Sequence, residues 1–225
     1  MNPSRKNWRR WIRGIAELAV AAGVLLSGGC DSSDSGSKGS ETASGAYLIT
    51  VYYTAVESFH GGSPETVKGR LSPESTSSLD VLGDYPSDFV AAVKSEGTGR
   101  ITSGGHAGHY LNWSYDIGFW LDQVPANAYG GALQSFRTAA ADPAVLPRGT
   151  RFKLAAPLIQ DNGAPLDDSI AARFLSAEWD VDDQFTPGYG GDNHLDLYIG
   201  EENQPDFTET SPLYITLKNV AIQRR

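Results

Sequence analysis

Cysteine, methionine and basic residues are scarce in this sequence, and long hydrophobic runs are missing. The 225 residues include one cysteine and one methionine, so no intramolecular disulfide can form and the fold must depend on an ordinary hydrophobic core. Lysine and arginine number 18 against 27 aspartate and glutamate residues, a balance that excludes a general affinity for nucleic acid phosphates. The main apolar run, residues 15–26, is too short to span a bilayer.

The first 30 residues have the layout of a bacterial lipoprotein signal. Five basic residues within 5–13 precede the apolar run, and a Ser-Gly-Gly sequence leads directly to Cys30. Small residues before a cysteine suit a lipoprotein signal peptidase, because the backbone must fit a narrow site and the thiol must accept a lipid. An ordinary signal peptide with an incidental cysteine is the alternative. Lipidation of Cys30 predicts a protein anchored on the extracytoplasmic face of the cell membrane.

Two further features concern export and the mature chain. The RRWIR sequence at 9–13 is typical of a twin-arginine signal, and the sequence leaves this route and the general secretory route open. Residues 30–45 are rich in Ser, Gly and acidic residues and predict a flexible tether before a domain at 46–225. Loss of residues 1–29, with five basic and one acidic residue, changes the formal net charge from −9 to about −13. A neutral or cationic surface is the expected partner.

The domain is predicted to be mainly β. Runs rich in β-branched and aromatic residues, bounded by Gly, Pro, Asn or Asp, predict strands at 47–54, 151–155, 171–179, 194–199 and 213–217. The best helix candidate is 86–96, where Ser87 can cap the first turn and Gly97 can end the helix. Many glycines and aromatics between 97 and 136 predict loops and short strands, as part of an insertion at about 80–136.

Four aspartates stand out by their positions. Asp196 lies inside the strand 194–199, and the two-residue period of a strand places it opposite Leu195 and Leu197, on one face with His194 and Tyr198. A carboxylate in an apolar strand costs free energy unless it is partnered or exposed in a cleft. The other three lie near strand ends; these are Asp142, Asp180 and Asp183.

These segments resemble a known family. AADPAVLPRGTRF, FLSAEWDV and HLDLYIG, with TVYYTA upstream, are similar to the three-aspartate domain shared with membrane-bound lytic murein transglycosylase A. The resemblance covers about 45–55 and 138–202. It implies a six-stranded double-psi β-barrel, here with a loop-rich, partly helical insertion, and it implies peptidoglycan as the partner.

The resemblance also implies a single catalytic carboxylate. In this family the aspartate of the last motif protonates the glycosidic oxygen and then acts as a base on the C6 hydroxyl, which closes a 1,6-anhydro ring; that aspartate corresponds to Asp196. Asp142 and either Asp180 or Asp183 would raise its pKa as neighbouring anions. The chain departs from the family between Asp180 and Asp192, which is longer by about five residues and lacks the family's lysine. The second aspartate therefore stays open.

Alternative interpretations accompany these assignments. Asp196 could accept hydrogen bonds from backbone amides and catalyse nothing, in which case the domain would bind peptidoglycan, another polysaccharide or an envelope partner. Asp142 precedes Pro143 and could simply form a turn. The candidate substrate-binding residues are Tyr53, Trp179, His194 and Tyr198, with Trp113, Tyr115 and Trp120 as further aromatics that could stack on sugars. His106 and His109 lack a third ligand nearby, so we expect no metal and no cofactor.

Overall fold

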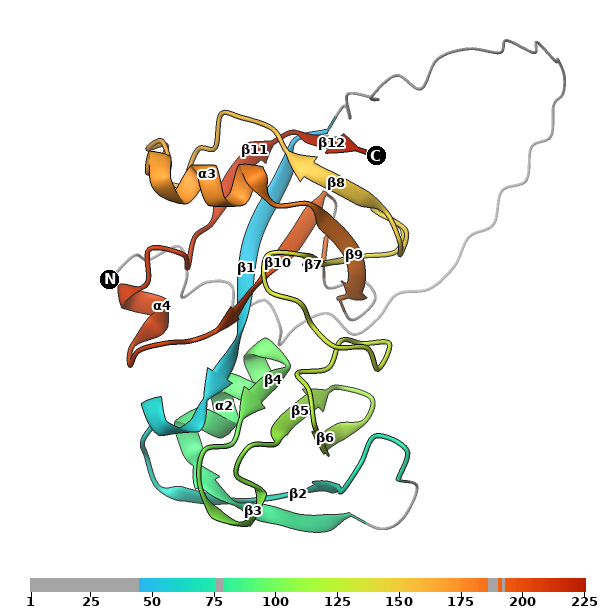
Figure 1. Ribbon diagram of the computed structural model, residues 1–225, viewed down its shortest axis with the longest axis vertical. Coiled ribbons are helices and arrows are strands. Elements are labelled where there is room, and N and C mark those ends of the chain that lie inside the picture. Colours follow the sequence, from blue (N-terminus) through green and yellow to red (C-terminus); the bar gives the residue numbers. More distant parts are fainter. Residues whose placement is uncertain (1–44, 76–78, 186–189, 192) are drawn as a thin grey trace, which may run out of the picture. The chain divides into compact units, whose positions relative to one another are not determined.

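The computed structural model describes residues 45–75, 79–185, 190, 191 and 193–225. Cys30, the signal segment and nearly all of the expected tether lie outside the described residues. The described chain belongs to one compact unit built mainly of strands (Figure 1). Twelve strands form one hydrogen-bonded sheet in the order β12-β8-β9-β7-β10-β1-β4-β5-β6-β2-β3, with β11 paired to β1.

Strand β1 joins two groups of strands. From Leu48 to Thr54, β1 (Tyr47–Val56) pairs in parallel with β10 (His194–Glu201), and at Tyr47 and Ile49 it also pairs with antiparallel β11 (Leu217–Val220). We call these strands, together with β7 (Thr138–Ala141), β8 (Arg151–Leu154), β9 (Trp179–Gln184) and β12 (Ile222–Arg224), the C-terminal group. The last two residues of β1 pair instead with β4 (Thr98–Arg100), which starts the second group.

The second group holds shorter strands and one packed helix. Its strands are β2 (Pro64–Arg70), β3 (Asp80–Pro86), β4, β5 (Tyr110–Ser114) and β6 (Gly118–Asp122). Helix α2 (Ser87–Glu96) buries Phe89, Val90 and Val93 and ends at Gly97, whose φ of 89° is left-handed. Short strands and loops therefore occupy 97–136, as the sequence predicts. The predicted cap at Ser87 is wrong, because Pro86 is the N-cap and no side chain bonds there.

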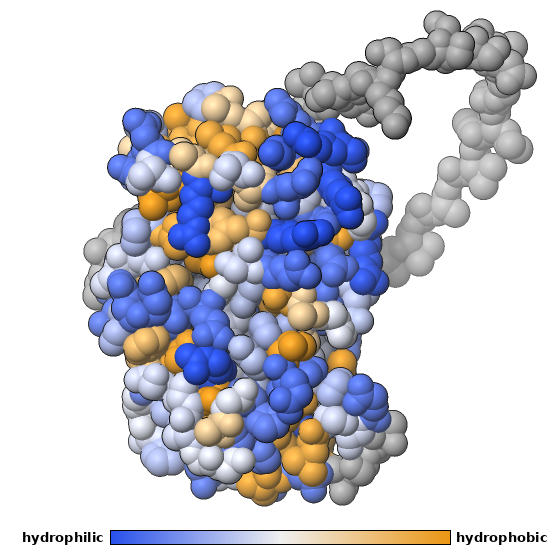
Figure 2. Space-filling model, viewed as in Figure 1, coloured by the Kyte–Doolittle hydropathy of each residue, from blue (hydrophilic) through white to orange (hydrophobic). Residues whose placement is uncertain are grey.

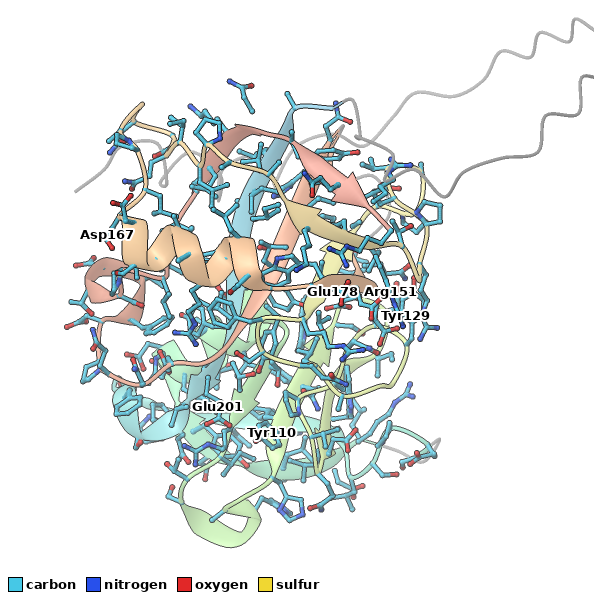
Figure 3. The ribbon with its side chains drawn as sticks, turned by 45° about the horizontal axis from the view of Figure 1, so that its top comes forward. Tyr110, Tyr129, Arg151, Asp167, Glu178 and Glu201 are labelled. Carbon is cyan, nitrogen blue, oxygen red and sulfur yellow. The ribbon has the colours of Figure 1, made fainter. Side chains whose placement is uncertain are left out.

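Two carboxylates, buried Glu57 and exposed Glu201, form hydrogen bonds at the junction between the two groups. Glu57, in the short 3-10 helix Glu57–Phe59, accepts hydrogen bonds from the backbone N–H groups of Thr102 and Ser103 at 2.7 and 2.9 Å. These bonds hold the pKa of Glu57 low although burial opposes them. At the end of β10, Tyr110 donates to Glu201 Oε1 at 2.9 Å, and the two residues lie together in Figure 3. The strands on either side of the junction are thus held in register.

Two strand predictions are wrong. Residues 171–179 are mostly helix α3 (Asp168–Ser176; Figure 3). The Asp167 carboxylate caps this helix by accepting the N–H groups of Ser169 and Ile170, and the Phe174 side chain packs inward. Strand β9 starts only at Trp179. The segment 213–217 meets β11 only at Leu217, because a turn precedes it in which the Tyr214 N–H bonds to the Ser211 carbonyl. The strands predicted at 47–54, 151–155 and 194–199 are confirmed as β1, β8 and β10.

The mainly β prediction is confirmed, but a closed six-stranded barrel is not what the strand order gives. The sheet has twelve strands and its path is open, ending at β12 and β3. The reason is that β1 continues beyond its contacts with β10 into the second group. Strands β11 and β12, separated by one residue, pair with β1 and β8 respectively. Of the remaining elements, helix α4 (Phe207–Thr210) follows β10 and the 3-10 helix Gly104–His106 follows β4.

Candidate active site

The polar faces of β1 and β10 form the floor of the site. In the parallel register Thr50 lies opposite Asp196 and Tyr52 opposite Tyr198. Leu195 and Leu197 are fully buried on the other face of β10. The prediction that Asp196 points away from these leucines is therefore confirmed.

Asp196 is partly exposed yet surrounded by protein atoms. The Thr50 hydroxyl lies 2.8 Å from Asp196 Oδ1 and also 2.8 Å from His194 Nε2. Burial raises the pKa of Asp196 to about 7, and the charge of Asp183 raises it further, while hydrogen bonds from Thr50 and the Leu197 N–H lower it. A carboxyl group with this pKa carries a proton in a large fraction of molecules near neutral pH.

Asp183 is the second acid of the site. Ala140 of β7 lies opposite Asp183 on one side and opposite Asp196 on the other, so β9 and β10 present the two acids at the same level. Tyr52 donates its hydroxyl hydrogen to Asp183 Oδ2 at 2.8 Å, and the Ala128 and Gln184 N–H groups donate to Oδ1 at 2.8 and 2.9 Å. Burial raises the pKa of Asp183, and these three bonds oppose the rise. Asp183 therefore accepts three hydrogen bonds from protein donors, which favour its ionised form against the effect of burial.

The two acids line one cavity of about 220 Å³. Its floor consists of Tyr52, Ala140, Asp183 and Asp196. Further lining residues come from the second strand group, at the end of α2, in β5 and β6 and in the turn between these two strands; they include Lys94, Glu96, Trp113, Tyr115 and Trp120. Tyr115 is 77% exposed, whereas Trp120 is 6% exposed. The cavity is thus a cleft lined by acidic and aromatic residues.

Asp180 does not join this site. It forms ion pairs with Arg151 at 3.1 Å and Arg137 at 3.4 Å, and it lines a separate surface pocket with Arg148 and Asp182. Hydrophilic residues gather over β8 and β9 in Figure 2, and Figure 3 labels Arg151 at this edge. The register shift between Ala139 and Ala140 in the β7–β9 pairing places Asp183, and not Asp182, opposite Ala140, the residue that also lies opposite Asp196, whereas Asp180 lies further along the strand, opposite Thr138. Of the two predicted alternatives, the structure selects Asp183.

Asp142 is also outside the cleft. Its side chain accepts the Ala144 N–H at 2.9 Å, and its backbone carbonyl accepts the Val145 N–H at 2.8 Å. These bonds form the turn that follows β7. The prediction that Asp142 perturbs Asp196 is wrong, and the alternative of a turn former describes its position.

Three of the aromatic candidates are parts of the packing. Trp179 is fully buried and packs on Phe136 and Phe174, so it is inaccessible to a ligand. Tyr53 is 4% exposed and its ring contacts Phe207 and Tyr214. Tyr198 is buried against Tyr52 and shares a 2.6 Å hydrogen bond with Thr54. All three side chains are buried, so the structure does not place them on the surface of the cleft as the prediction requires; β9 and β1 turn Trp179 and Tyr53 toward the core.

His194 is buried next to the acid. Its Nδ1 atom lies 3.0 Å from the Gly190 carbonyl oxygen, and its ring stacks on Phe185 with centroids 4.8 Å apart. Burial lowers the pKa of His194, so the neutral imidazole is favoured. The residue contacts Thr50 and not the cleft itself.

Sequence reasoning missed Thr50, Tyr52 and the loop that holds Ala128. A signal for the first two exists, because Thr50, Tyr52 and Thr54 alternate with apolar residues in β1 and share a face by the two-residue period. No local signal links the Ala128 N–H to Asp183, because the two are 55 residues apart.

Neither a metal site nor a membrane-spanning helix is found among the described residues. Among the described residues no group of three or more His, Cys, Asp and Glu side chains is placed to hold a metal ion, and His106 and His109 stack edge to face at 6.0 Å. Within the same part of the chain no helix is both long and apolar enough to cross a bilayer.

The fold is similar to those of solved lytic transglycosylases. E. coli MltA, in its complex with chitohexaose, aligns with a TM-score of 0.52 and 15% identity over 80% of this chain and 72% of that chain. A membrane-bound lytic murein transglycosylase of Agrobacterium tumefaciens aligns with a TM-score of 0.47 and 10% identity, over 79% and 73%. LtgG of Burkholderia pseudomallei aligns with 0.43 and 14%, over 80% and 72%. No family model and no curated protein matches the chain. At these identities the likeness to E. coli MltA shows a common fold.

Proposed function

We propose that this protein is a lytic transglycosylase of peptidoglycan with Asp196 as its single acid and base. One observation carries the proposal: Asp196 lies partly exposed in a cleft beside a second carboxyl group, that of Asp183, and its burial among protein atoms raises its pKa to about 7. A general acid works best when its pKa is close to the working pH. The fold shared with E. coli MltA, whose solved complex contains chitohexaose, supports a glycan as the ligand.

The chemistry needs one carboxyl group because the substrate supplies its own nucleophile. Protonated Asp196 gives its proton to the oxygen of the glycosidic bond between N-acetylmuramic acid and N-acetylglucosamine, and the bond to C1 breaks. The resulting Asp196 carboxylate then takes the proton of the C6 hydroxyl while the oxygen of that hydroxyl bonds to C1. The product is a 1,6-anhydro sugar, and Asp196 ends protonated. A hydrolase requires a second carboxylate to activate water, and this reaction does not.

Asp183 supplies charge in this scheme and stays unprotonated. It accepts three hydrogen bonds, from Tyr52, Ala128 and Gln184, which favour its ionised form. Its charge raises the pKa of Asp196 and stabilises the positive charge that develops on the sugar ring as the bond to C1 breaks. Tyr115, an exposed residue of the cleft lining, offers a ring face on which a sugar can stack.

The finer fold and location belong to the same proposal. We take β1, β7, β8, β9 and β10, with β11 and β12 as one interrupted strand, to be the counterpart of a six-stranded double-psi barrel of the three-aspartate type. Pairing of β11 with β1 and of β12 with β8 supports this correspondence. Cys30 is the proposed lipid attachment site on the extracytoplasmic face of the membrane. Metabolic labelling with palmitate tests it, and labelling that persists in Cys30→Ala would exclude it.

Digestion of purified murein tests the activity. We expect the protein to release 1,6-anhydro-muropeptides, identified by mass spectrometry, and Asp196→Asn to lower the rate by about 10² to 10⁴. Asp180→Asn is the matched control, because it removes one carboxylate of β9 that lies outside the cleft. Equal product profiles from the wild type and Asp196→Asn would end the catalytic proposal. Retention of an inactive protein on insoluble murein would then favour a non-catalytic polysaccharide-binding domain.

A further inference from the structure

The hydrogen bonds around Asp196 form a chain of four groups. Asp196 Oδ1, Thr50 Oγ1 and His194 Nε2 are linked by two contacts of 2.8 Å, and His194 Nδ1 lies 3.0 Å from the Gly190 carbonyl oxygen. The chain crosses from β10 to β1 and back, since Thr50 lies opposite Asp196 in the register and His194 is two residues from Asp196. Each link has the length of an ordinary hydrogen bond.

The direction of each bond follows from counting hydrogens. A carbonyl oxygen only accepts, so His194 Nδ1 must carry a hydrogen and donate it to Gly190. In a neutral imidazole Nε2 then has a lone pair and accepts the Thr50 hydroxyl hydrogen. Thr50 has only that one hydrogen, so in this state its oxygen accepts from protonated Asp196, whereas Thr50 Oγ1 donates to Asp196 Oδ1 when the carboxyl group is ionised. All three bonds are therefore made when Asp196 is protonated and His194 is neutral.

We propose that His194 is a positioning residue for Asp196: by accepting the Thr50 hydroxyl hydrogen, it turns the Thr50 lone pair toward Asp196 and keeps the reactive proton on that carboxyl. This inference rests on the proposed function of Asp196 as the acid. Placing the proton on His194 instead would also satisfy the three bonds. Burial lowers the pKa of His194 and raises that of Asp196, which favours the proton on Asp196.

The chain changes direction during the reaction. When Asp196 gives its proton to the glycosidic oxygen, the Thr50 hydroxyl turns from His194 to the new carboxylate. When the carboxylate takes the proton of the C6 hydroxyl, Thr50 turns back to His194. Asp196 loses one proton and regains one, and His194 stays neutral throughout. The bond to His194 is missing only in the ionised state, so His194 opposes the ionised state and raises the pKa of Asp196.

Other charged groups near Asp196 come from three elements. Asp183 of β9 and Tyr52 of β1 interact electrostatically with it, and Lys94 and Glu96 of α2 line the same cleft. His194 contacts the Phe185 ring and the Gly190 carbonyl. Substitutions at Thr50 and His194 leave these four titratable groups in place, so a change in the titration of Asp196 can be assigned to the hydrogen-bond chain.

Two substitutions should shift the pH profile in opposite directions. In His194→Phe no ring nitrogen accepts the Thr50 hydroxyl hydrogen, so that hydroxyl can donate to the Asp196 carboxylate. The pKa of Asp196 therefore falls. We expect the rate of murein cleavage at pH 8 to drop by about tenfold relative to the rate at pH 5.5. In Thr50→Val the carboxylate loses its donor, so the pKa rises and the alkaline limb moves to higher pH. His194→Gln, whose side-chain oxygen can accept from Thr50, keeps the wild-type limb. A uniform loss of rate in His194→Phe at every pH would overturn the proposal.

The double variant and nitrogen NMR complete the test. In a Thr50→Val background, His194→Phe should shift nothing further, because the chain is already broken. The full-length protein with ¹⁵N-labelled histidine has four histidines, and we expect His194 to carry its hydrogen on Nδ1 and to show a step in the Nε2 shift near pH 7 that Asp196→Asn abolishes. A hydrogen on Nε2, or a step that survives in Asp196→Asn, would overturn the proposal. The NMR measurement does not need activity. An inactive wild type would therefore reject the proposed function, while the NMR result would still decide whether the hydrogen-bond chain through Thr50 and His194 exists.

Discussion

Strand β9 carries two acidic positions that behave in opposite ways, although only three residues separate them. Asp180 lies at the surface, where it forms ion pairs with Arg137 and Arg151. Asp183 faces the cleft, where burial raises its pKa and hydrogen bonds replace the missing arginines. The comparison teaches that the register of β9 against β7, which sets Asp183 at the level of Asp196 and Asp180 further along the strand, decides which carboxylate lines the cleft.

The largest expected effect is on the pH dependence of the free energy of unfolding, which a carboxyl group buried in the cleft changes and a carboxylate at the surface does not. The folded-state pKa of Asp196 is raised from 3.8 to about 7, so the folded protein prefers the protonated form. Stability from this group is complete below pH 4 and is lost as pH rises from about 4 to about 7, with an upper bound of about 4 kcal/mol. Asp196→Asn removes this loss. We expect its urea midpoint to exceed that of the wild type at pH 8, with the difference vanishing at pH 4.

A control separates Asp196 from other titrating groups. His194 contributes with the opposite sign, because its lowered pKa costs stability as pH falls below about 6.5. The sign of this contribution distinguishes it from the contribution of Asp196, which is lost as pH rises. Asp180→Asn should keep the slope of the wild type. A difference between the wild type and Asp196→Asn that is equal at pH 4 and pH 8 would contradict the assigned burial of Asp196.

The next effect concerns Asp183 and the pH dependence of activity. Asp183→Asn keeps the carbonyl oxygen that accepts from Ala128 and Gln184 but removes the charge. Without that anion the pKa of Asp196 falls, although burial still holds it above the usual range. We expect the alkaline limb of murein cleavage to move to lower pH, with about a tenfold loss of rate near pH 7.5. Initial rates between pH 5 and 8 measure the shift, and an unchanged limb would show that Asp183 does not act on Asp196 through its charge.

Local patterns predicted the strands that carry the acid and failed where a short polar cap decides the structure. Alternating residues identify β1 and β10, and the same alternation places His194, Asp196 and Tyr198 on one face. Residues 171–179 contain strand-forming aromatics, yet the Asp167 cap and the buried Phe174 make most of the segment a helix. Capping residues that lie before a periodic run thus outweighed composition.

The sequence predicted site residues within single strands, but it did not predict the contacts between distant strands that complete the site. The motif around Asp196 indicates a candidate acid, but its partners Thr50 and His194 meet across a parallel pairing of residues about 145 positions apart. The choice between Asp180 and Asp183 depends on the register of β9 against β7, which no local pattern indicates. The position of Trp179, at the buried start of β9, depends on the packing of α3. Long-range register therefore supplied what the sequence alone left open.

The smallest expected effect is that of Asp180→Asn, and it provides the strictest test of the contrast along β9. Its two arginine partners are 56% and 60% exposed at their side chains, so water and salt screen these pairs and the substitution should cost about 1 kcal/mol or less. Murein cleavage should change by less than about twofold, because surface substitutions away from a site rarely alter it. Urea midpoints at low and high salt and the murein assay measure both quantities. A loss of activity comparable with that of Asp183→Asn would show that the surface pocket with Arg148 and Asp182 takes part in substrate binding, and the distinction between the two acids of β9 would then fail.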